Sequence, residues 1–84
     1  MTKWREAAIG RGIDPIEVGG LNVWGEEWRP VDAPEVCLPH PAYPKQIHNY
    51  KIYEIGNASH PVRFAVAELS NQVWGFYVPE ENSN

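Results

Sequence analysis

Long apolar runs and paired cysteines are both missing from this 84-residue chain. No apolar segment approaches the ~18 residues that a membrane-spanning helix needs. Residues 1–12 carry scattered charges where a secretory signal would be apolar. The one cysteine, Cys37, cannot form an internal disulfide, as is usual in a reducing compartment. We therefore expect a soluble, cytoplasmic protein with no membrane contact.

Clustered positive charge is missing as well. The 7 lysine and arginine residues form no cluster, and the formal net charge is −4. Binding to a phosphate backbone needs several cations on one surface, so we expect no nucleic-acid partner.

Patterns typical of catalysis are also lacking. The chain has no phosphate-binding glycine loop, no nucleophile elbow and no internal repeat. Glu26 and Glu27 would face opposite ways in a strand, and Glu80 and Glu81 belong to a polar end segment. We therefore predict that the protein is not an enzyme and needs no cofactor.

Few side chains could bind a soft metal ion, and they are Cys37, His40, His48 and His60. The two-residue gap between Cys37 and His40 is one that zinc sites use, but structural zinc sites usually contain two such pairs. We predict no metal site. A small-ligand or metal-binding domain built on these residues is the alternative function.

Residues 50–78 are the most informative part of the chain. Segments 50–53, 62–67 and 73–78 are rich in β-branched and aromatic residues and are separated by turn-forming residues. This pattern predicts a three-stranded antiparallel meander.

Side-chain alternation predicts which residues share a face of that meander. A loop at residues 69–71 places the bulky even-numbered residues together, whereas a two-residue turn at 70–71 would set them against Gly75 and Tyr77. We prefer the first register, which pairs Val66 with Trp74, Phe64 with Phe76 and Val62 with Val78. We expect Tyr50 and Ile52 on the same apolar face.

The opposite face is predicted to carry two phenols and two cations over small side chains, namely Lys51, Tyr53, Arg63, Ala65, Ala67, Gly75 and Tyr77. The N-terminal or the proline-rich segment could cover this trough. Alternatively it is a partner groove in which Arg63 holds a carboxylate or phosphate. Tyr53, Arg63 and Tyr77 are therefore candidate binding residues.

The N-terminal third contains two weaker patterns. Thr2 as an N-cap predicts a short helix over residues 3–10 that ends at Gly10 and docks on the sheet through Trp4 and Ile9. Residues 14–23 fit either one helical turn or a hairpin around two glycines, and we favour the hairpin.

Trp24 and Trp28 form the second concentration of aromatic residues. Gly25 and Pro30 leave too little room for a helix, so we predict a tight turn that runs into an edge strand. The two indoles either cap the core or form a stacking platform for a sugar, a base or a proline-rich peptide. They complete our set of candidate binding residues.

Residues 31–46 contain four prolines and are predicted to run extended over the surface. Residues 36–38 could pair as a short strand. We expect the segment to cover the apolar face of the sheet, with Leu38 and Tyr43 buried against it.

Together these patterns predict an α+β fold over residues 1–79. A short N-terminal helix packs on a four- to five-stranded antiparallel sheet that could curl toward a small barrel, and residues 80–84 form a disordered acidic tail. The predicted function is a non-catalytic interaction module with an unknown protein or peptide partner. An exposed strand edge could also form a homodimer.

Overall fold

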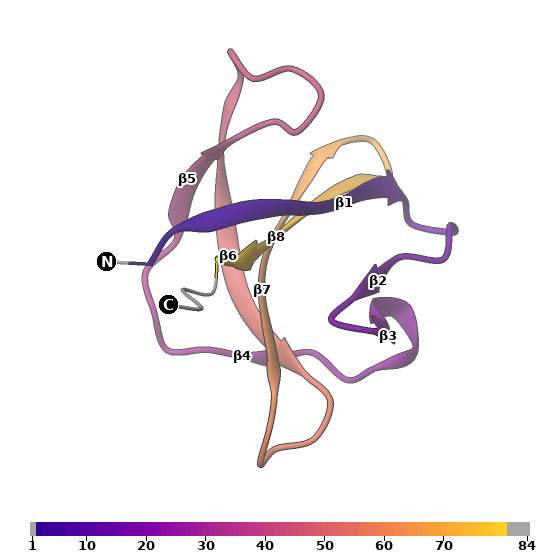
Figure 1. Ribbon diagram of the computed structural model, residues 1–84. Helices are drawn as coiled ribbons and strands as arrows, with labels where there is room; N and C mark the ends of the chain where they lie inside the picture. The colour runs from indigo at the N-terminus through magenta and orange to yellow at the C-terminus, as the bar shows by residue number, and fades with distance from the viewer. Residues whose placement is uncertain (1, 81–84) are drawn as a thin grey trace.

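The computed structural model describes residues 2–80, and its regular structure is mostly antiparallel β-sheet (Figure 1). Six strands form one sheet in the order β1-β8-β7-β6-β4, with β5 paired to another part of β6, while β2 and β3 form a separate hairpin. The elements are β1 (Trp4–Arg11), β2 (Glu17–Val18), β3 (Leu21–Asn22), the 3-10 turn η1 (Val23–Gly25), β4 (Arg29–Pro30), β5 (Val36–Pro39), β6 (Ile47–Ile55), β7 (Val62–Ser70) and β8 (Val73–Pro79).

The predicted α+β class is wrong, because the described residues contain no helix of seven or more residues. A helix was expected over residues 3–10, but Trp4–Arg11 forms strand β1 along β8. A two-turn helix is unstable alone, whereas the unpaired edge of β8 supplies this segment with a full ladder of hydrogen bonds. Tertiary pairing therefore overrides the helical tendency of this segment.

The predicted meander is confirmed as β6, β7 and β8. Its bulky even-numbered residues do share one face, as predicted. The pairing of β7 with β8 is shifted by two residues from the register that we preferred. Val66 lies opposite Phe76 instead of Trp74, because both strands run on into a tighter turn. Gln72, with φ 65°, takes the left-handed position in that turn, and a bulge between Glu68 and Ser70 absorbs the change in register.

The predicted facing of β6 is wrong. Tyr53 lies opposite Phe64, and Ile52 lies opposite Ala65. Tyr50 and Ile52 therefore point to the side of Ala65, away from Phe64. A change of one residue in the length of a connection moves every side chain of the strand to the opposite face of the sheet. The sequence pattern did not determine the length of the connection at residues 56–61.

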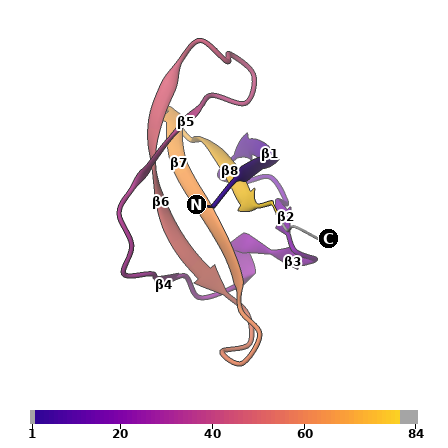
Figure 2. The same cartoon turned by 60° about the vertical axis from the view of Figure 1, so that its left-hand side comes forward.

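The hairpin at residues 17–22 is confirmed. Gly19 and Gly20 have φ values of 60° and 85°, as a two-residue turn of this kind requires. The hairpin and η1 cover one side of the sheet, and the segment between β4 and β5 lies on the other side (Figure 2).

The sheet therefore has a core on each face. The first core lies under the hairpin and consists of Ile16, Val18, Val23, Ile55, Phe64, Val66 and Phe76. The second core consists of Tyr50, Ala65 and Tyr77, with half-buried Leu38, Val36 and Trp4 against it. Both faces of the central strands therefore carry a packed core.

The proline-rich segment does not cover the apolar face of Phe64 and Phe76, as expected for it, but lies on the opposite face over the second core. That position is the one considered for it in the trough. The predicted short strand is confirmed as β5, and Leu38 is half-buried. Tyr43 was expected to be buried but is 61% exposed. Its ring packs at a tilt against His40 instead, with ring centroids 4.8 Å apart, because the turn after β5 carries it beyond the edge of the sheet.

The edge strand predicted after Trp28 is confirmed as β4, which pairs with β6. At the other end of the chain, Glu80 follows β8, and its N–H donates to the Lys3 carbonyl at 2.7 Å. The rest of the predicted acidic tail, residues 81–84, lies outside the described residues.

Candidate functional site

The proposed phenol face does not exist as one surface, because Tyr53 and Tyr77 lie on opposite sides of the sheet. Tyr53 is half-buried beside the first core and stacks on Phe64 at 6.2 Å. Tyr77 is only 3% exposed in the second core. The two residues cannot share a ligand, and Tyr77 serves the packing of the sheet.

Arg63, the third candidate of that face, is occupied by a neighbour. Its Nη2 donates to Glu54 Oε2 at 2.8 Å and its Nε donates to the same oxygen at 3.2 Å. The pair links β7 to β6 in register and is partly exposed. An exposed pair of this kind contributes little stability, but it does hold the guanidinium in place.

Tyr50 and Tyr77 share one acceptor in the second core. Their hydroxyls donate to the Pro39 carbonyl oxygen at 3.1 Å and 2.7 Å. His40 N–H donates to the Gln46 carbonyl, so the neighbouring Pro39 carbonyl points away from β6 and is free to accept. Desolvation by burial raises the pKa of Tyr50 to about 12, and the pKa of Tyr77 is raised by the same cause. Both phenols therefore remain protonated donors.

Trp24 and Trp28 do lie together, stacked with ring centroids 5.5 Å apart at 21°. Trp28 is fixed by its indole N–H, which donates to the Val23 carbonyl at 2.8 Å, and by an edge contact with Phe64. Trp24 is 36% exposed and meets Trp74 edge-on at 5.9 Å. Trp28 is therefore part of the core, and Trp24 is the indole of this pair that a ligand could reach.

The possible metal ligands do not converge. Among residues 2–80 no three side chains of His, Cys, Asp or Glu gather closely enough to hold a metal ion. Cys37 is exposed and its sulfur contacts Asn49 Oδ1 at 3.1 Å. The Nδ1 atom of His40 accepts the backbone N–H groups of Ala42 and Tyr43, which organises the turn after β5.

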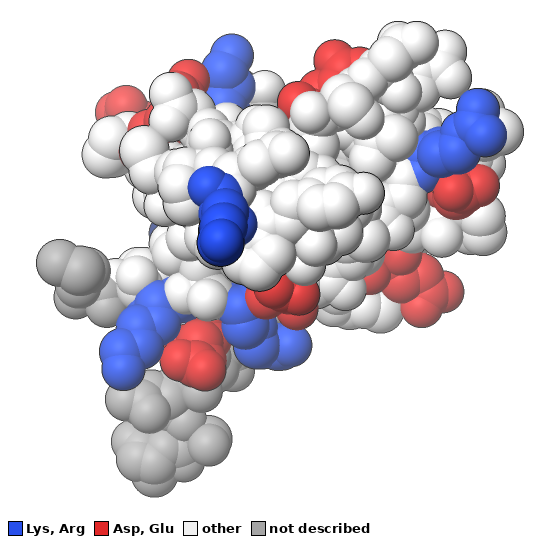
Figure 3. Space-filling model, turned by 90° about the horizontal axis from the view of Figure 1, so that it is seen from above, with Lys and Arg blue, Asp and Glu red and all other residues white. Residues whose placement is uncertain are grey.

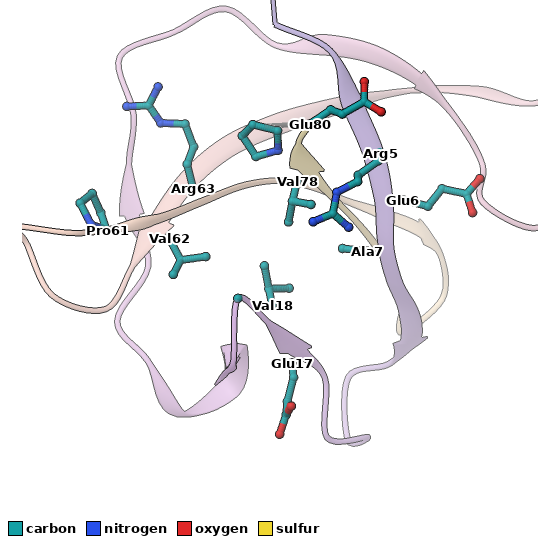
Figure 4. A pocket seen from close by; sticks show the side chains of 12 residues that line it. Arg5, Glu6, Ala7, Glu17, Val18, Pro61, Val62, Arg63, Val78 and Glu80 are labelled. Carbon is teal, nitrogen blue, oxygen red and sulfur yellow. The ribbon is translucent and has the colours of Figure 1, made fainter. Parts of the chain in front are cut away.

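A groove lies between β1 and the β2–β3 hairpin, and no sequence pattern predicted it. It has a volume of about 770 Å³. We call it the β1 groove. Val18, Val62 and Val78 point into it, and β1 supplies Arg5, Glu6 and Ala7 (Figure 4). The groove thus combines an apolar floor with one side formed by residues of β1.

The edge of β1 that faces away from β8 has no strand partner among the described residues. Because Glu80 is hydrogen-bonded to Lys3, the next hydrogen-bonded pair is Arg5 with Val78. Glu6 lies between that pair and the bulge at Ala7, so its backbone N–H and C=O point away from β8. An extended ligand could pair with these groups.

The sequence contained only a partial signal for this site. Val62 and Val78 were expected on the apolar face, but they were expected to be covered. Arg5 and Glu6 lie within the segment that was predicted to be a helix, so no strand edge was foreseen there. An alternation of apolar and polar residues along 4–11 would have been the sequence signal for a strand. The two adjacent alanines and the bulge weaken that alternation.

Charges of both signs are interspersed on the face shown in Figure 3. Within the described residues there is no helix with the length and apolar character needed to cross a lipid bilayer. Comparison of the chain with protein-family models, with curated proteins and with solved structures finds no match.

Proposed function

We propose that the protein is a non-catalytic interaction module that captures an extended segment of a partner protein along the free edge of β1. The observation that carries this proposal is the coincidence of an unpaired strand edge with an apolar groove beside it. An added strand gains backbone hydrogen bonds from the edge, and its alternate side chains gain contacts from the groove.

The rest of the molecule supports this choice. Outside the β1 groove, packed cores occupy both faces of the central strands. The last part of β1 is closed off by a turn, in which Arg11 N–H donates to Asp14 Oδ2 at 3.0 Å. The first half of β1 is therefore the stretch of unpaired strand edge that borders the β1 groove.

The bulge at Ala7 and the charges of Arg5 and Glu6 act against unselective pairing. Proteins use bulges and charged edge residues to prevent aggregation through exposed strands. A partner segment must accommodate the bulge and the two charges, so the edge favours some sequences over others.

Selection of random heptapeptides displayed on phage, with immobilised protein, tests the proposal. Glu6→Pro removes the outward-pointing N–H, and Glu6→Ala keeps it while removing the same side chain. Because proline is tolerated where the N–H faces solvent, both variants should stay folded. We expect binders to the wild-type protein and to Glu6→Ala, with at least tenfold weaker retention on Glu6→Pro.

Equal retention on Glu6→Pro, or no enrichment on the wild-type protein, would contradict the proposal. Loss of retention on Trp24→Ala together with unchanged retention on Glu6→Pro would instead favour the second candidate, a stacking platform at Trp24. The exposure of that indole is the observation in its favour.

A further inference from the structure

Arg5 is the one charged side chain that Figure 4 shows turned into the β1 groove. Arg5 lies opposite Val78 in the ladder, so its side chain projects to the same side of the sheet as that valine. The carboxylates of Glu6, Glu17 and Glu80 point away from the centre of the groove, and so does the guanidinium of Arg63 (Figure 4).

The Arg5 guanidinium has no counter-ion within residues 2–80. The ion pair of the described structure joins Arg63 to Glu54, and no hydrogen bond from the Arg5 side chain to another described residue is present. The guanidinium therefore stands over valines, and residues 2–80 make no use of its donors. A ligand that brings a carboxylate to this position would satisfy them without displacing a partner from these residues.

The chemistry of such a ligand follows from the two parts of the groove. A guanidinium presents a planar fork of N–H donors that matches the two oxygens of a carboxylate. The floor formed by Val18, Val62 and Val78 accepts an aliphatic side chain. In an extended peptide, side chains two positions apart point to the same side at a spacing of about 6.5–7 Å.

We propose that the β1 groove selects an extended peptide segment in which an acidic residue and an aliphatic residue stand two positions apart. The carboxylate pairs with Arg5, the aliphatic side chain rests on the valine floor, and the peptide backbone pairs with the edge of β1. This inference rests on the proposed function and names its partner chemistry. The outward glutamates at the rim favour basic residues at the two ends of the segment.

Two capped heptapeptides test the inference directly. The first is acetyl-Lys-Thr-Val-Thr-Glu-Thr-Lys-amide, and the second has Gln in place of Glu. Capping removes the terminal charges, so the two peptides differ only in the carboxylate. Titration of isotope-labelled protein, followed by amide chemical shifts, gives both the affinity and the location of binding.

We expect the Glu peptide to bind wild-type protein at least tenfold more tightly than the Gln peptide, with shifts concentrated in β1. In Arg5→Gln the two peptides should bind alike. Arg11→Gln is the matched control, because this exposed arginine of the same strand lies outside the groove, and it should retain the tenfold preference.

Other outcomes overturn the inference in distinguishable ways. Equal binding of both peptides at β1 of the wild-type protein would refute the pairing of a peptide carboxylate with Arg5. It would leave the proposed interaction module standing. Absence of binding by either peptide refutes the motif, and the phage selection then decides separately whether β1 captures any segment. A dimer in sedimentation that dissociates in Arg5→Gln would show that a second copy of the chain occupies the groove.

Discussion

The side-chain hydroxyls of Tyr50 and Tyr77 both donate to the backbone carbonyl of Pro39. These two hydrogen bonds attach the proline-rich segment to the sheet. Pro39 cannot donate a backbone hydrogen bond, and its carbonyl points away from β6. Phenol hydroxyls from β6 and β8, the two strands that flank β7, donate to this carbonyl. The rings meet edge-on at 5.2 Å, so packing and hydrogen bonding fix the same geometry.

This arrangement predicts non-additive losses of stability. Tyr50→Phe and Tyr77→Phe should each lower the free energy of unfolding by about 0.5–1.5 kcal/mol, because one donor remains for the carbonyl. The double variant should lose more than the sum, since the half-buried Pro39 carbonyl then has no side-chain donor. Urea denaturation of the four proteins measures this difference.

Tyr43→Phe provides the control, because Tyr43 is exposed and its hydroxyl has no described partner. It should leave the unfolding midpoint unchanged. Strict additivity in the double variant would show that the two hydroxyls do not act on a shared acceptor.

The β2–β3 hairpin matters most among the elements, because it both covers the first core and forms a wall of the β1 groove. Its turn depends on two glycines with positive φ values, but their surroundings differ. A Cβ atom on Gly19 would approach Val62 Cγ1 to 2.7 Å, whereas a Cβ atom on Gly20 meets nothing within 4 Å. The close contact between Gly19 and Val62 seats the hairpin tip against β7.

This difference predicts unequal effects of the same substitution. Gly20→Ala should cost about 1–2 kcal/mol of unfolding free energy, from the left-handed backbone alone. Gly19→Ala adds a clash with Val62, and overpacking of this kind costs a further ~1–3 kcal/mol. Thermal and urea denaturation of both variants checks the prediction.

Equal losses in the two variants would mean that the hairpin tip does not rest on Val62. A double variant, Gly19→Ala with Val62→Ala, provides a further check. It should recover part of the loss because the smaller side chain leaves room for the added methyl group.

The molecule as a whole is a curled sheet with a core on each face, and this arrangement makes its stability sensitive to alkaline pH. Tyr50 has a pKa of about 12 in the folded protein against an ordinary value of 10.0, and the pKa of Tyr77 is raised in the same direction. Below pH 10 both phenols are protonated whether the chain is folded or unfolded. Above it, the unfolded chain loses these protons first.

We therefore expect the free energy of unfolding to fall as the pH rises from about 10 to about 12. Urea denaturation at pH 8, 10 and 11 measures the fall. In Tyr50→Phe the fall over this interval should be smaller, because one of the two groups is gone. An identical fall in the variant would assign the effect to other groups.

The β1 groove is a property of the whole molecule, because it exists only when three distant parts of the chain meet. Arg5 comes from the first strand, Val18 from the hairpin, and Val62 and Val78 from the meander. No short motif contains them, so no sequence pattern could have selected them together. Trp24 and Trp28, which are close in sequence, were the candidates whose proximity the sequence could indicate.

The amino-acid sequence alone determined those elements that depend on the conformational preferences of neighbouring residues. The β-branched runs of residues 62–66 and 73–78, the glycine pair at the hairpin tip and the proline that limits β5 each act through their own conformational preferences. Those preferences led to the meander, its bulky shared face, the hairpin and the short strand. The packing of the proline-rich segment over small side chains such as Ala65 was likewise anticipated as one interpretation.

Tertiary contacts decided the rest. Residues 4–11 became a strand because β8 offered an open edge, and a two-turn helix had no comparable source of hydrogen bonds. The facing of Tyr50 and Tyr53 depended on the exact length of a six-residue connection, since side chains alternate with a period of two. The β1 groove followed from that altered topology, because a strand edge and a hairpin that are remote in sequence had to be brought together by the curl of the sheet.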